Sequence, residues 1–216
     1  MRKACLLFAC LLILPVFASA KNPGIGFGLK AGVDYSKFLM SFKKAFSPSP
    51  QEYRWVRGFH IGGGLSVALT ETISFNPELI FSQQGSEWQF KLTELRIVEP
   101  NDPFFVEDLH GEFQESIILL PLLFRVQPGD RFSVEAGSQF GLLVHQALTG
   151  DLSGYSDKTS SLRLSACLGV GYRVLGNARV GLRYSIGLIR RYYVYKEYSS
   201  FLQFGVEYQI PKGQTF

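Results

Sequence analysis

Residues 24–35 decide the fold, and they read Gly24-Ile25-Gly26-Phe27-Gly28-Leu29-Lys30-Ala31-Gly32-Val33-Asp34-Tyr35. Every second residue from Ile25 to Tyr35 is apolar, and the residues between them are glycine, lysine or aspartate. Such alternation gives a β-strand one apolar and one polar face. Soluble strands usually run for about five or six residues. A longer alternating run of about 9–11 residues suits a tilted strand that crosses a membrane.

The same alternation recurs in seven further segments and predicts an all-β protein. These segments begin near residues 59, 73, 116, 132, 162, 180 and 202. In the segment 116–126 both faces are apolar, so its orientation is ambiguous. We place Ile118 and Phe124 outward, because this turns Arg125 away from lipid. An arginine that faces lipid near the midplane costs about 2–4 kcal/mol.

The connections between the eight segments alternate between short and long. Tight turns follow the second, fourth and sixth segments, whereas long connections span roughly 36–56, 85–115, 146–159 and 190–199. Short periplasmic turns and long external loops are typical of outer membrane barrels. We therefore predict an eight-stranded antiparallel transmembrane β-barrel in a bacterial outer membrane. A soluble lipocalin-like barrel also has eight strands, but it would point its apolar face inward.

The start of the chain predicts export from the cytoplasm. Residues 1–20 resemble a secretory signal peptide, with a basic start, an apolar stretch and a small-residue cleavage site at Ala18-Ser19-Ala20. The barrel domain is then residues 21–216. Removal of the signal takes away Arg2 and Lys3, so the formal net charge falls from +4 to +2.

The composition of the exported part excludes several classes of protein. Cys167 is the one cysteine outside the signal peptide, which excludes a disulfide-stapled scaffold. The small net charge gives no basic footprint for nucleic acid. Mean hydropathy is +0.10, although no exported segment approaches the roughly 18 apolar residues of a membrane helix. Outward-facing strands account for that hydropathy.

Four segments resemble the strands of a known family. Residues 75–85 are similar to the PEL-(I/L)-(F/Y)-SQ-x-G segment of the Bacteroidetes outer membrane β-barrel family, which includes PorT-like proteins. Residues 120–123 resemble its IPLL strand, and residues 168–172 and 182–188 resemble its GxGY and LRYxxGL strands. The resemblance implies an outer membrane barrel without a catalytic motif, and it links some members to protein secretion.

The last predicted strand resembles the signal by which outer membrane barrels are recognised for assembly. That pattern is polar-x-Gly-x-x-aromatic-x-apolar, and the residues that fit it are Gln203, Gly205, Tyr208 and Ile210. A polar tail follows the strand here, which departs from the pattern. Strand alternation alone produces part of the same pattern.

Charged residues occupy many of the predicted inward positions. An eight-stranded barrel has an interior just wide enough for side chains, so buried charges there need partners. We expect a charge network that fills the lumen, in which glutamates pair with arginines. A narrow channel is the alternative. The predicted members are Lys30, Asp34, Glu78, Arg125, Glu135, Arg163, Arg179, Arg183 and Glu207.

The long connections carry opposite charges and the clearest functional hints. Residues 85–115 hold eight acidic and two basic residues, whereas Lys43, Lys44, Arg190 and Arg191 make two other external loops basic. Docking of a protein partner and contact of the basic loops with lipopolysaccharide phosphates are two hypotheses for these loops, and a solvated surface of mixed charge is the alternative. The alternation continues through Trp88, so we also expect this hairpin to project above the membrane and offer a strand edge.

Signals for catalysis are weak. His60, His110 and His145 lie on different segments and lack metal-ligand spacing, and no local motif arranges a catalytic triad. We therefore predict no enzyme, no cofactor and no metal. The predicted role is structural or external-loop binding, with a secretion or surface assembly as one setting. A lipid-modifying outer membrane enzyme is the remaining alternative, and the sequence leaves the oligomeric state open.

Overall fold

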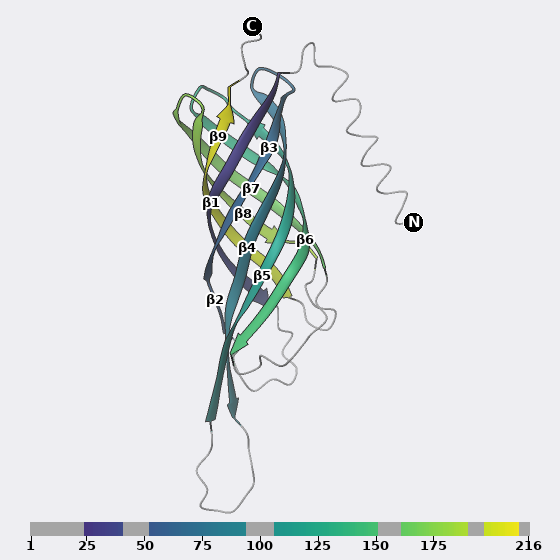
Figure 1. Cartoon of the computed structure of the whole chain (residues 1–216), viewed down its shortest axis with the longest axis vertical. Helices are drawn as coiled ribbons and strands as arrows, with labels where there is room; N and C mark the ends of the chain where they lie inside the picture. The colour runs from purple at the N-terminus through teal and green to yellow at the C-terminus, as the bar shows by residue number, and fades with distance from the viewer. Residues whose placement is uncertain (1–23, 41–51, 94–105, 151–160, 190–196, 212–216) are drawn as a thin grey trace, which may run out of the picture.

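The computed structural model describes residues 24–40, 52–93, 106–150, 161–189 and 197–211. Within these residues all regular elements are β-strands (Figure 1). None of these residues belongs to a helix that could cross a membrane. The strands are β1 (Ile25–Met40), β2 (Glu52–Arg54), β3 (Val56–Ala68), β4 (Ile73–Thr93), β5 (Val106–Val126), β6 (Phe132–Gly150), β7 (Leu162–Leu175), β8 (Ala178–Gly187) and β9 (Glu197–Ile210).

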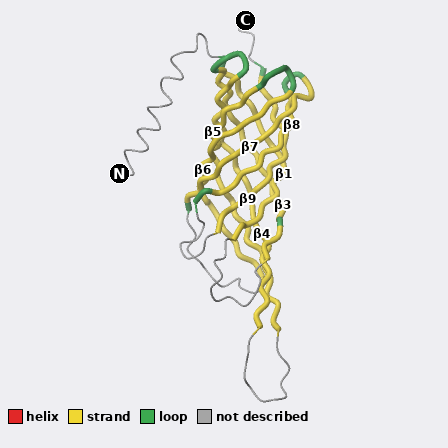
Figure 2. The backbone as a smooth tube through the Cα atoms, turned by 180° about the vertical axis from the view of Figure 1, so that it is seen from behind, coloured by secondary structure: helices red, strands yellow, loops and turns green. Residues whose placement is uncertain are grey.

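The sheet closes into a barrel of eight antiparallel strands. The first strand β1 pairs with the last strand β9 over Phe27–Met40, and β4 pairs with β5 to complete the ring. The short β2 continues β3 beyond Trp55 and pairs with β4 at Glu87–Gln89. Figure 2 shows the strands wound obliquely around one axis. The predicted fold class is confirmed.

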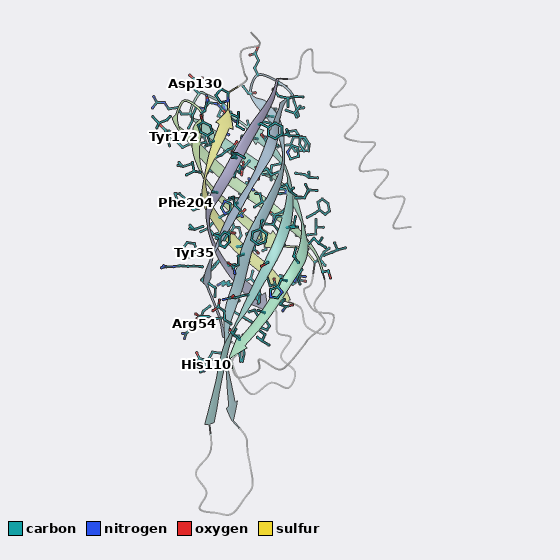
Figure 3. All side chains as sticks on the ribbon, in the orientation of Figure 1. Tyr35, Arg54, His110, Asp130, Tyr172 and Phe204 are labelled. Atoms are coloured by element: carbon teal, nitrogen blue, oxygen red, sulfur yellow. The ribbon has the colours of Figure 1, made fainter. Side chains whose placement is uncertain are left out.

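The outer surface of the barrel is apolar. Phe27, Leu29, Leu168 and Phe204 are each more than half exposed, as the alternation predicts for positions that face lipid. Figure 3 shows Tyr172 and Phe204 pointing away from the barrel wall. On β5, whose orientation was ambiguous, Arg125 is buried and its neighbours on either side are exposed, which confirms the choice made from the cost of a lipid-facing arginine.

The two ends of the barrel differ. One end carries the tight turns at 69–72, 127–131 and 176–177, with the two described chain ends beside them (Figure 1). At the other end the strands are longer than predicted. The stretch 85–115, expected as a connection, is mostly paired strand, because β4 runs to Thr93 and β5 begins at Val106. The expected projection of this hairpin is confirmed (Figure 1).

The apolar band predicts how the barrel responds to a misplaced charge. Leu79 is 60% exposed on β4, midway between the turn and the projecting hairpin. Leu79→Arg should destabilise the folded barrel by about 2–4 kcal/mol, measured by urea unfolding in lipid vesicles. The control is Val126→Arg, since Val126 is also exposed but lies next to a turn. There the cost should be about 0–1 kcal/mol. Equal losses of unfolding free energy in the two variants would contradict the placement of Leu79 near the membrane midplane and of Val126 near its edge.

Candidate functional site

A network of ion pairs fills the turn-side half of the lumen. Arg183 lies at its centre, with its guanidinium nitrogens 2.8 Å from Glu78 and 2.7 Å from Glu135. Arg125 joins Glu135 at 3.1 Å and Glu207 at 2.8 Å. The two arginines therefore connect three carboxylates into one chain of charge-assisted hydrogen bonds.

Two further cations complete this network. The Lys30 ammonium pairs with Glu78 and lies 3.4 Å from Glu207. Arg179 lies 4.0 Å from Glu207 and donates a hydrogen bond of 2.8 Å to the Gln127 side chain. Four cations and three carboxylates thus come from six of the eight barrel strands: β1, β4, β5, β6, β8 and β9.

The other two strands make room for the network. A Cβ added at Gly64 on β3 would lie 2.9 Å from Glu78 Cγ, and one at Gly169 on β7 would lie 2.9 Å from Glu135 Cγ. Real Cβ atoms essentially never approach so closely. These glycines are therefore part of the charged interior, because any larger residue would displace a carboxylate from its partners.

Asp34, His60 and Ser82 form a second polar group farther from the turns. His60 Nδ1 lies 2.7 Å from Asp34 Oδ1, and the Ser82 hydroxyl donates to the other Asp34 oxygen. In a catalytic triad the histidine lies between serine and aspartate. Here the aspartate lies between them and all three side chains are buried, so the arrangement orients His60 without activating Ser82.

An apolar layer lies beside this polar group. Ile80, Ile117, Leu119 and Phe201 pack together inside the barrel, with Leu143 against them. The sequence reasoning missed Ile80 and Phe201. Ile80 lies within a continuous apolar run, and Phe201 lies just before the predicted start of its strand. Extending the alternation backward from Gln203 would have placed Phe201 inward.

One acidic residue assigned to the external hairpin belongs to the lumen instead. Glu115 is 1% exposed, and its carboxylate lies 3.2 Å from Arg163. The expectation that Glu115 contributes to an acidic outer surface is therefore wrong. The reason is length, because β5 pairs with both neighbours well beyond the point where a connection was expected.

Aromatic side chains cover the external mouth of the barrel. Phe38 lies 5.8 Å from both Tyr53 and Phe113 between ring centroids, and Trp88 lies 6.5 Å from Phe113. Phe38 and Trp88 are buried. This aromatic cap joins β1, β2, β4 and β5, so it also holds the base of the projecting hairpin.

A small cavity remains within the charged half of the lumen. Its volume is about 50 Å³, and its lining includes Lys30, His60, Arg179 and Gln203. A water needs about 10–15 Å³ measured in this way, so a few waters fit. The charge network, the apolar layer and the aromatic cap follow one another along the barrel axis.

The remaining predicted residues fall in three places. On β9, Gln203 is buried in the lumen, whereas Tyr208 and Ile210 are exposed on the outer surface. Gly205 leaves space for His60, because a Cβ there would lie 2.8 Å from His60 Nε2. An assembly role for these four stays a prediction. The signal peptide and the loop residues Lys43, Lys44, Arg190 and Arg191 lie outside the described residues.

A groove lies on the projecting part of the sheet. Its volume is about 480 Å³, and Trp88, Arg54, Glu87, His110 and Glu112 belong to its lining. Glu87 and Glu112 are directly opposite each other on β4 and β5. Figure 3 shows Arg54 and His110 at the base of the hairpin, at the opposite end from Asp130.

These features define a small outer membrane β-barrel protein. They are a closed barrel with an apolar outer surface, a filled lumen, short turns at one end and long strands at the other. A family model described as "Outer membrane protein beta-barrel domain" matches residues 17–192, so the chain belongs to that family. The protein is therefore a bacterial outer membrane protein. The narrower PorT-like resemblance is not established by this match.

Solved structures support the same fold. One is Ail, the attachment invasion locus protein of Yersinia pestis, solved in complex with the heparin analogue sucrose octasulfate. Its TM-score is 0.50 at 12% sequence identity, and the match covers 86% of this chain and 99% of Ail. Neisserial surface protein A has a TM-score of 0.50 at 15% identity, covering 87% of this chain and 99% of that protein. At these identities the likeness shows the fold alone.

The comparisons assign no activity. No curated protein matches the chain. Within the described residues, no group of three or more His, Cys, Asp or Glu side chains is placed to hold a metal ion. Cys167 is buried, with its sulfur 3.2 Å from the Ser185 hydroxyl.

The network predicts a large cost for removing its central cation. Arg183→Met should destabilise the barrel by about 3–5 kcal/mol in urea unfolding, because it leaves Glu78 and Glu135 buried with weaker compensation. The control is Arg173→Met. Arg173 is also on a strand and half-buried, but it forms no ion pair among the described residues. A cost of Arg183→Met no larger than that of the control would contradict the central role of Arg183.

Proposed function

We propose that the protein is a structural outer membrane barrel whose projecting β4–β5 hairpin binds a protein partner outside the cell. The observation that carries this proposal is the register of the hairpin. Gly85–Thr93 pairs with Val106–Gln114, and beyond the residues that pair with β2 and β6 the two strands continue as a two-stranded ribbon. A protein that only needed to cross the membrane would not require this extension.

The ribbon offers backbone edges for a partner. On β4, the neighbour β2 covers Glu87–Gln89 and no strand covers 90–93 within the described chain. On β5, the pairing with β6 ends at Gly111, and no second strand covers 106–109 among the described strands. Unpaired N–H and C=O groups of an edge strand accept an added strand from another chain.

Aromatic packing fixes the base of the ribbon to the barrel. Phe38, Tyr53, Trp88 and Phe113 pack beneath it and join it to β1 and β2. Binding to a preorganised surface costs less ordering free energy than binding to a flexible loop. The groove lined by Trp88 and His110 lies beside the same edges and supplies a place for partner side chains.

The resemblance to PorT-like proteins makes a secretion or surface assembly the favoured setting for this partner.

The lumen gives less support to a channel, since charged, apolar and aromatic layers occupy it. It also gives no support to a lipid-modifying enzyme, because Ser82 donates to Asp34 and not to His60. We also propose that the basic loops with Lys43 and Arg190 contribute to partner binding.

The experiment is site-specific photo-crosslinking in the native membrane. A photoreactive residue at position 91 on the ribbon should capture a discrete partner, whereas the same residue at Asp130, on the opposite side of the membrane, should not capture it. A second variant removes residues 90–109 and joins Gln89 to His110 through an Asn-Gly turn, which suits that facing pair.

The shortened variant keeps Trp88 and Phe113, so its barrel should remain folded and migrate differently in SDS before and after boiling. It should lose the partner when a second photoreactive residue, at Arg54, is used for detection. Capture of the same partner by the shortened and full-length proteins would overturn the proposed role of the ribbon.

A further inference from the structure

We propose that the lipid-facing surface of β1 and β3 carries a binding site for the phosphates of lipid A, the membrane anchor of lipopolysaccharide. The residues of this site are Lys37 and Arg57, with Trp55 and Tyr35 beside them. It is distinct from the partner-binding ribbon and from the lumen network, because its side chains point outward from the barrel.

The depth of the two cations fits the phosphate level of the outer leaflet. Ten residues separate Lys37 from Phe27, which is exposed near the turn end of β1, and Arg57 on β3 is opposite Tyr35, two residues before Lys37. At about 3.3 Å per residue and a tilt near 40°, this distance corresponds to about 25 Å along the barrel axis. The apolar band of such barrels is also about 25 Å tall. Lys37 and Arg57 therefore lie just beyond its external edge.

Aromatic rings hold both cations at this edge. The Lys37 ammonium lies 4.9 Å from the centroid of the Trp55 ring, and the Arg57 guanidinium lies 5.8 Å from that of the Tyr35 ring. Both contacts are cation–π interactions. A ring neutralises no charge, and it leaves N–H donors of each cation available to phosphate oxygens.

Neither cation has a carboxylate partner within the described residues. Arg57 is opposite Tyr35 on β1, and Lys37 is opposite Ser200 on β9. Lys37 lies one residue beyond the last pair of β1 and β3, Ser36 with Val56, which makes it a diagonal neighbour of Arg57. Diagonal neighbours are separated by about 7–8 Å. Two like charges so close together are stabilised by an anion that contacts both.

Lipid is the anion source that this surface selects. The two cations stand above a continuous lipid-facing surface, with exposed Val33 and Phe59 directly below them. An acylated phosphate can place its chains on that apolar surface and its charge between Lys37 and Arg57. A free phosphate ion would gain the charge contacts alone.

The test is lipid titration of the purified full-length barrel in detergent, followed by native mass spectrometry. The probes are bis-phosphorylated lipid A and the same lipid without phosphates. The wild-type protein should bind the phosphorylated form more tightly. Lys37→Gln and Arg57→Gln should each weaken that binding about fivefold, and the double variant about 25-fold. Lys37→Arg should bind as the wild type does.

The control is Arg131→Gln. Arg131 is an exposed arginine beside an interfacial tyrosine at the turn end, where its Nη1 donates to the Tyr172 hydroxyl at 3.4 Å. This variant should bind lipid A as the wild type does. The proposal is overturned if the double variant keeps wild-type affinity, if removal of the phosphates has no effect, or if Arg131→Gln loses as much as Lys37→Gln. Different migration of boiled and unboiled samples verifies that each variant is folded.

Discussion

The narrow interior of an eight-stranded barrel is the constraint on which the rest of the structure depends. Its lumen accommodates side chains but little water, so every charge there must find a partner in the same space. Arg183 and Arg125 meet this requirement by joining Glu78, Glu135 and Glu207 across the barrel. Six strands supply the charges of this network, and β3 and β7 supply glycines at the facing positions. The strands are thus cross-linked through the lumen as well as around the wall.

Because side chains fill the interior, the surfaces available for binding lie on the outside of the barrel. Above the network lie an apolar layer around Leu119 and the aromatic cap around Trp88. The cap closes the mouth and anchors the β4–β5 ribbon, so the features that seal the barrel also present its longest extension. Lys37 and Arg57, on the lipid side, offer a second outward surface. Both proposed binding sites therefore lie outside the lumen.

The sequence predicts the wall of this barrel better than its interior. Alternation with period two and the cost of an arginine in lipid together orient Arg125 and its whole strand. The identity of the inward charges follows from the same pattern. Their pairing does not, because Glu78 and Arg183 are 105 residues apart and meet only through the stagger of the closed sheet. The sequence predicts Glu115 on the exterior for a related reason, since it does not reveal where pairing with neighbouring strands ends.

Conductance across a planar lipid bilayer tests whether paired charges and packed side chains fill the lumen. The purified wild-type barrel, shown to be inserted and folded, should produce no ion current steps at either polarity. Steady single-channel currents, with an ion selectivity that changes when Arg183 and Glu78 are replaced by Gln, would show a continuous water path through the network. That result would contradict a filled lumen and would favour a channel function.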